Sequence, residues 1–132
     1  MAQAVYNFLG FSINEIRYIN ERKSNSYINI SIVKDNYNEE LSQYTQLIKV
    51  ASDFSSRESI FIFQTDFKIN DEKWFESLDE KMKKSVFFSI SFPFIREKLF
   101  SITSDTNPGL FMPTLDIRNV DLNKEIKLIR KG

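Results

Sequence analysis

The segment that decides the fold is Ser91-Phe92-Pro93-Phe94-Ile95-Arg96-Glu97-Lys98-Leu99-Phe100, which leads on to Pro108-Gly109-Leu110-Phe111-Met112-Pro113. A proline between two phenylalanines precedes an Arg-Glu pair, and apolar residues continue at helical spacing as far as Leu99. Proline lacks an N–H donor and clashes with the preceding turn, so Pro93 predicts either a kink in a helix or the start of a new one. The second stretch predicts a crossover loop that is bounded by prolines and rich in large apolar side chains.

Helical periodicity extends on both sides of this segment. Apolar side chains at spacings of three and four predict a helix over 85–104, and another from Asp71 to Lys84 with Asp71 as its N-cap. Residues 105–109 contain Pro and Gly and are expected to end the long helix. Farther on, Asp121 to Lys131 predicts a short C-terminal helix.

Before residue 70 the apolar period is two. Alternation predicts strands over Phe11–Glu21, Ile28–Val33, Tyr44–Phe54 and Ile60–Ile69, joined by short polar connections that include 35–40. In the first of these strands, the alternating apolar positions change parity at Asn14-Glu15, which indicates a β-bulge. The prediction is a single α+β domain over 1–132: a four-stranded antiparallel meander sheet, a long helix that is kinked or restarted at Pro93, the crossover loop and a short C-terminal helix.

The composition excludes most catalytic and metal-binding chemistry. Cys and His are absent, so zinc thiolate sites, cysteine nucleophiles and His-based triads are not available. No Gly-rich phosphate-binding motif occurs. Acidic doublets such as Asp79-Glu80 could imitate a catalytic carboxylate pair, but their positions at caps and on polar faces favour solvated charge. We therefore expect no enzyme, no cofactor and no metal.

Charge and hydropathy also limit the partners. Basic and acidic residues balance at 18 each, which gives no electrostatic basis for nucleic-acid binding. No apolar run is long enough to span a membrane, and the first nine residues do not have the pattern of a signal peptide. A cytoplasmic location is the simplest expectation.

The aromatic-Pro-aromatic-x-Arg-Glu pattern of Phe92 to Glu97, placed after four strands, resembles the bacterial export chaperone SecB and its SecB-like relatives. The resemblance covers essentially the whole chain. It implies a homotetramer, built as a dimer of dimers with the long helices between the sheets, and an ATP-independent holdase that binds unfolded or precursor polypeptides. On this basis the expected oligomer-interface residues are Phe94, Ile95, Arg96, Glu97, Leu99 and Ile102.

Aromatic residues make up 14% of the chain and include 13 Phe, which could leave apolar surface beyond the needs of the core. Any single one is more simply explained as core, but sequential pairs such as Phe87-Phe88 diverge on a helix. In the crossover loop, Met and aromatic side chains suit a surface that accepts unrelated apolar segments. The predicted client-binding residues are Trp74, Phe75, Leu78, Phe87, Phe88, Leu110, Phe111 and Met112.

Two departures from the family bear on its partners. Export-type members are strongly acidic, whereas this chain is neutral and its segment Lys124 to Lys131 is basic. Docking to an export motor is therefore in doubt, and a dedicated client such as an antitoxin is slightly favoured over secretory precursors. The alternative interpretation is a structural or adaptor protein that uses the same fold for oligomeric assembly and binds no unfolded client.

Overall fold

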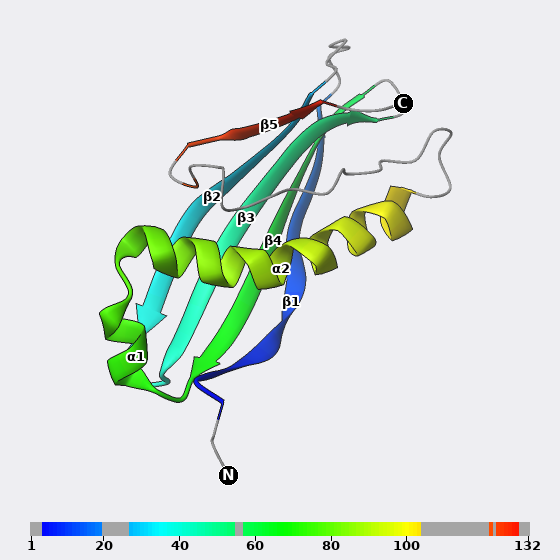
Figure 1. Ribbon diagram of the computed structural model, residues 1–132. Helices are drawn as coiled ribbons and strands as arrows, with labels where there is room; N and C mark the ends of the chain where they lie inside the picture. Colours follow the sequence, from blue (N-terminus) through cyan, green and yellow to red (C-terminus); the bar gives the residue numbers. More distant parts are fainter. Residues whose placement is uncertain (1–3, 20–26, 55–56, 104–121, 123, 130–132) are drawn as a thin grey trace.

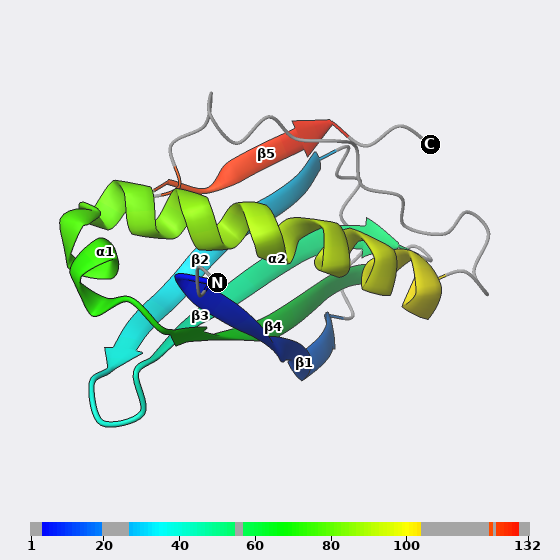
Figure 2. The same ribbon diagram turned by 60° about the horizontal axis from the view of Figure 1, so that its bottom comes forward.

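A curved antiparallel sheet carries both helices on one face (Figures 1 and 2). The structure is a computed structural model that describes residues 4–19, 27–54, 57–103, 122 and 124–129. The expected α+β class, with an antiparallel sheet followed by helices, is confirmed. The elements are β1 (Tyr6–Ile19), β2 (Tyr27–Asn38), β3 (Gln43–Phe54), β4 (Arg57–Ile69), α1 (Glu72–Ser77), α2 (Glu80–Thr103) and β5 (Ile126–Ile129).

The strand order is β1-β4-β3-β2-β5, with all neighbours antiparallel. The predicted meander is therefore correct for β2, β3 and β4 but wrong for β1, which pairs with β4 instead of β2. Followed in reverse from β4 to β1, these four strands have the Greek-key order: β4, β3 and β2 are successive neighbours, and β1 lies beside β4. An interior position, between β1 and β3, suits β4, because its first half carries apolar side chains on both faces.

Bulges adjust which side chains of the outer strands face the helices. The register of β1 shifts between Ile13 and Glu15, which confirms the predicted bulge, and also between Phe8 and Gly10. Gly10 has φ +139° at this second bulge, a conformation that residues with a side chain avoid. Sequence alternation starts β1 too late, at Phe11, because this bulge breaks the period.

The second strand is longer than the alternation predicts. Residues 35–38, expected to form part of a polar connection, continue β2 as far as Asn38 and pair with β3. A register shift between Ile32 and Lys34 changes the parity, after which Tyr37 faces the helices beside Phe75. The polar composition of this stretch gives no sign of a strand. Pairing with β3 and the contact of Tyr37 with Phe75 stabilise it instead.

The helix boundaries also differ from the prediction. Asp71 does cap α1, since its side chain accepts a hydrogen bond from the Trp74 N–H at 3.0 Å. The expected helix over Asp71–Lys84 is nevertheless divided, because Asp79 accepts from the Met82 N–H at 2.7 Å and caps a new helix there. From that point α2 runs for 24 residues and continues through Pro93 without a break.

The predicted C-terminal helix is wrong where the structure describes it. Residues Ile126–Ile129 form β5, which is antiparallel to the first part of β2. Ile126 and Leu122 are buried in the core. Pairing with β2 satisfies backbone groups at the sheet edge that a helix would leave open.

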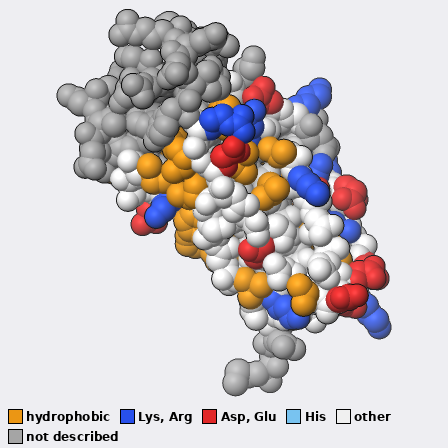
Figure 3. All heavy atoms as spheres, turned by 180° about the vertical axis from the view of Figure 1, so that it is seen from behind, with side chains coloured by type: hydrophobic (Ala, Val, Ile, Leu, Met, Phe, Trp, Pro, Cys, Tyr) orange, Lys and Arg blue, Asp and Glu red, His pale blue; other side chains and the backbone are white. Residues whose placement is uncertain are grey.

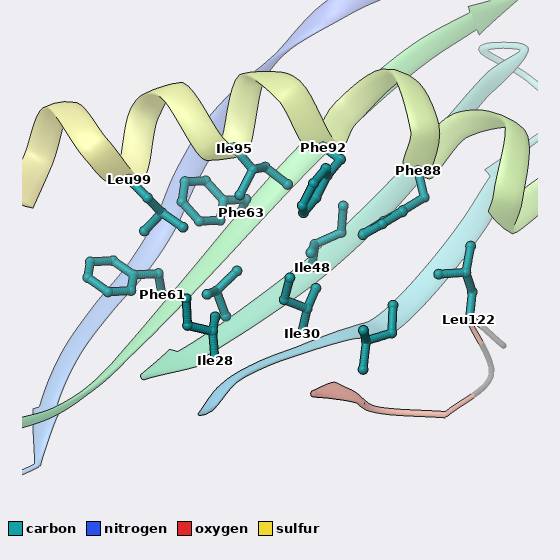
Figure 4. Close-up of a cluster of buried hydrophobic side chains, with 12 residues drawn as sticks. Ile28, Ile30, Ile48, Phe61, Phe63, Phe88, Phe92, Ile95, Leu99 and Leu122 are labelled. Carbon is teal, nitrogen blue, oxygen red and sulfur yellow. The ribbon is translucent and has the colours of Figure 1, made fainter. Parts of the chain in front are cut away.

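The core lies between α2 and the sheet in two apolar clusters (Figure 4). From α2, Phe88, Phe92, Ile95 and Leu99 point into the first cluster at spacings of three and four residues, as Figure 4 shows. Their partners from the sheet and the C-terminal segment are Ile28, Ile30, Ile48, Val50, Phe61, Phe63, Leu122 and Ile126. The second cluster, nearer α1, contains Tyr44, Phe67, Ile69, Phe75 and Phe87.

This packing predicts a strong contrast between two phenylalanines of the same helix. Phe88 is 0% exposed and Phe100 is 50% exposed. We expect Phe88→Ala to lower the free energy of unfolding by about 3–5 kcal/mol, because it removes buried apolar contacts and leaves a cavity. The matched change Phe100→Ala is expected to cost less than about 1 kcal/mol. Urea denaturation followed by circular dichroism measures both, and equal losses would contradict the packing described here.

Candidate functional site

The aromatic side chains gather where α1 and the start of α2 meet the sheet. Trp74 stacks on Tyr6 with ring centroids 5.9 Å apart, and Phe87 lies against Tyr44 and Phe67 at 4.7 Å each. Phe75 contacts Tyr37 at 4.5 Å. Because α1 is only six residues long, these ring contacts hold it on the sheet.

A pocket of about 330 Å³ opens beside this cluster, between the end of β2 and the two helices. We call it the corner pocket. The rings of Tyr37, Tyr44 and Phe75 line it together with carboxylates from both sides. The residues that line it are Asp35, Asn36, Tyr37, Glu39, Tyr44, Phe75, Glu76, Glu80 and Lys83.

One cation of the chain itself lies in the corner pocket. The Lys83 Nζ atom is 4.5 Å from the centre of the Phe75 ring and 3.6 Å from Glu80 Oε1. On the sheet side, the buried Tyr44 hydroxyl donates to Asp35 Oδ2 at 2.8 Å and accepts from Gln46 Nε2 at 3.2 Å. The pocket therefore combines aromatic surface with carboxylate oxygens, an arrangement that stabilises positive charge.

A second apolar surface lies between β1 and α2. Phe94 stacks on Phe8 at a centroid distance of 4.9 Å and lies 5.9 Å from Phe11. A hollow of about 340 Å³ lies beside them, lined by Phe11, Phe94, Glu97, Lys98 and Ser101. Phe94 is 40% exposed. We call Phe8, Phe11 and Phe94 the aromatic face.

The opposite side of the sheet is different in character. Seen from behind (Figure 3), it is mostly polar with small apolar patches. The Asp66 carboxylate accepts hydrogen bonds from Thr45 Oγ1 at 2.7 Å and from the Gln43 and Gln64 amides at 3.2 Å. Asn14 extends this network by donating to Gln64 Oε1. These five side chains thus satisfy one another across neighbouring strands.

The structure places the predicted client-binding residues in unlike environments. Trp74 and Leu78 are half-buried, and Phe75 lines the corner pocket although it is mostly covered. Phe87 and Phe88 are both fully buried, one in each core cluster, because the sheet is wide enough for diverging side chains. Contact between these two and a client would require α2 to lift from the sheet. Residues Leu110, Phe111 and Met112 lie outside the described residues.

The predicted interface residues also separate into two groups. Ile95 and Leu99 are buried in their own subunit, whereas Phe94 and Glu97 are exposed. Arg96 and Ile102 are half-buried, and the Arg96 Nε atom is buried without a hydrogen-bond partner among the described residues. The exposed members lie on the same side of α2 as the aromatic face, whereas Ile95 and Leu99 belong to the core beneath it.

The corner pocket contains residues that the sequence did not single out. Tyr37, Tyr44 and Lys83 come from three different elements, and no spacing in the chain relates them. The only available signal is the continuation of β2 beyond its bulge, which brings Asp35 and Tyr37 to the helix side of the sheet.

Comparison with solved structures identifies the fold as SecB-like. The structure is similar to the Mycobacterium tuberculosis Rv1957 SecB-like chaperone, which was solved in complex with a ChAD peptide from the Rv1956 HigA1 antitoxin. The TM-score is 0.61 at 14% sequence identity, and the match covers 84% of this chain and 90% of that one.

By sequence, no family model and no curated protein matches the chain. At 14% identity the likeness is one of fold.

Two further observations concern the described part of the chain. Within the described residues, no group of three or more acidic side chains is placed to hold a metal ion. None of the helices in that part of the chain is long and apolar enough to cross a membrane.

Burial raises the pKa of Tyr44 well above its ordinary value of 10.0. A group whose pKa is raised in the folded state stabilises the fold while it is protonated, and this contribution is lost as the pH rises above the unfolded value. We expect wild type to lose stability above about pH 10, whereas Tyr44→Phe should lose distinctly less over the same range. Urea midpoints at neutral pH and above pH 10 measure the difference, and parallel losses in both proteins would contradict it.

Proposed function

We propose that this chain is a SecB-like, ATP-independent molecular chaperone that binds unfolded segments of a client polypeptide. The observation that carries the proposal is a SecB-like fold whose long helix is apolar on more than its buried side. Met82, Phe94 and Phe100 are each 40–50% exposed on α2, although four other apolar side chains of the same helix already fill the first core cluster. A helix that is apolar around most of its circumference is usually covered on more than one side.

The aromatic face supports a homotetramer in which α2 packs against another subunit. Phe94 stacks with β1 residues on one side and is open on the other, beside exposed Glu97. The assembly expected from the resemblance is a dimer of dimers.

The client is proposed to be one dedicated protein in preference to secretory precursors in general. The neutral charge of the chain does not provide the acidic surface expected for an export motor. The structurally similar Rv1957 is itself in complex with an antitoxin peptide. We propose that the protein acts in the cytoplasm, without catalysis or a cofactor.

Aggregation of an unfolded model protein tests the chaperone activity. Stoichiometric wild type, without ATP, is expected to suppress light scattering. Trp74→Ala and Phe111→Ser should require roughly tenfold more protein for equal protection, since large aromatic anchors dominate binding energy. Leu41→Ser, a change at an exposed turn residue, is the control and should protect like wild type.

If wild type gives no protection but still assembles, the adaptor interpretation replaces this proposal. If Trp74→Ala and Phe111→Ser protect as well as wild type, the client-binding residues have been assigned incorrectly.

Size in solution tests the assembly separately. Wild type is expected to elute as a tetramer in size-exclusion chromatography with light scattering. Phe94→Asp should shift it to smaller species, because a charge would be buried against the partner without compensation. Leu41→Asp introduces the same charge at an exposed turn position and should leave the size unchanged. A monomeric wild type would contradict the proposed assembly.

A further inference from the structure

The strand β5 occupies part of the sheet edge that β2 forms (Figures 1 and 2). Its four residues, Ile126–Ile129, pair antiparallel with Tyr27–Ile30. From Ser31 to Asn38, β2 pairs with β3 alone within the described residues. The outer edge of β2 is therefore divided: the C-terminal strand of the same chain takes the first part, and no described strand pairs with the rest.

In the described part of the chain, two kinds of contact attach β5 and the residues just before it to the domain. Besides the four-residue ladder, the segment buries Leu122, which is 4% exposed, and Ile126, which is 8% exposed. Figure 4 shows Leu122 at the margin of the first core cluster, on the side of β5. The other ten members of that cluster come from α2, β2, β3 and β4. Release of β5 therefore leaves most of the core in place, and such a unit opens at a lower free energy than the whole fold.

The contacts that β5 makes are of a kind that many unfolded segments can also make. A backbone ladder requires no particular side chains, and Leu122 and Ile126 contribute only apolar surface. An extended apolar segment of another polypeptide can supply both. Because β5 belongs to the same chain, its effective concentration at this edge is high, so a segment from outside has to compete with it.

We propose that β5 is an autoinhibitory strand, which an extended apolar segment of the client displaces from the Tyr27–Ile30 edge of β2. The inference rests on the proposed chaperone function and adds its regulation: β5 keeps this edge paired in the free protein, and a client gains access to it by replacing β5. A paired edge also protects the free protein, because an open sheet edge invites association with other chains.

A reversible disulfide tests the proposal, because the chain has no cysteine of its own. Asn29 of β2 and Lys127 of β5 are register partners, and the Cα atoms of such partners are separated by a distance that a disulfide can span. The double variant Asn29→Cys with Lys127→Cys therefore locks β5 when oxidised and releases it when reduced. The control, Gln43→Cys with Lys68→Cys, joins register partners of β3 and β4 in the same way.

The probe is fluorescently labelled, reduced and alkylated α-lactalbumin, an unfolded protein whose binding is followed by fluorescence anisotropy. We expect the oxidised double variant at Asn29 and Lys127 to bind this probe roughly tenfold more weakly than its reduced form, because β5 can no longer leave the edge. The control double variant should bind the probe equally in both forms.

Weakening the attachment of β5 should have the opposite effect. Ile126→Ser removes one of the two buried apolar side chains and should tighten probe binding roughly tenfold, whereas Lys124→Ser, at an exposed position, should not change it. Thermal unfolding confirms that both variants are folded. Hydrogen exchange with wild type gives an independent measurement: the probe should speed exchange of the Ile126–Ile129 amides and leave the amides of β3 protected.

The outcomes separate this inference from the chaperone function. Equal binding by the oxidised and reduced double variant, together with suppression of aggregation by wild type, would overturn autoinhibition and leave the chaperone function in place. Probe binding by Ile126→Ser without binding by wild type would support autoinhibition. A larger assembly of Ile126→Ser at unchanged probe affinity would assign the edge to a second copy of the chain and overturn displacement by a client. If neither wild type nor any variant binds the probe, both proposals fail.

Discussion

The packing of α2 across the sheet is the interaction on which the rest of the structure depends. Phe88, Phe92 and Leu99 of α2 pack against the sheet in the first core cluster. Strands β2, β3, β4 and β5 contribute buried side chains to this cluster, and β1 contributes partly buried ones. With apolar burial worth about 25 cal/mol per Å², this contact is the main source of stability for a chain without disulfides. It also determines which faces of the helix and of the sheet stay available to partners.

A buried polar layer divides the core into its two clusters. Gln46 and Thr65 are opposite each other on β3 and β4, and Ser91 of α2 is buried as well. The Gln46 amide donates to the Lys84 carbonyl at 3.3 Å and so ties the sheet to the helix at one register. Because an unpaired buried polar group is costly, this contact disfavours sliding of α2 along the sheet. The positions of the corner pocket and of the aromatic face relative to the strands follow from that register.

Local patterns in the sequence predict the elements better than their arrangement. Alternation finds the strands, the parity change finds the bulge at Asn14, and the Asp71 cap is correct, since each depends on residues close in sequence. The pairing of β1 with β4 depends on the whole sheet, and the second half of β2 is stabilised by Tyr37 against a distant helix. The sequence could not predict that Phe87 and Phe88 are both buried. Their positions on a helix predict the directions in which they point, but not that the sheet is wide enough to cover both side chains.

The two edges of the sheet differ in a way that bears on function. Along β1, the bulges at Leu9 and Asn14 interrupt regular pairing, and the apolar side chains Phe8 and Phe11 turn toward α2, so contact there would be made mainly by side chains. Along β2, β5 pairs with the first residues as far as Ile30, and within the described residues the rest of β2 pairs with β3 alone, beside the corner pocket with its four carboxylates and one ammonium. Side-chain contact suits a fixed partner of constant sequence, whereas main-chain pairing tolerates varied sequences and adds selectivity through one pocket. The proposed assembly through the first edge and the proposed client binding at the second therefore make compatible demands on the same sheet.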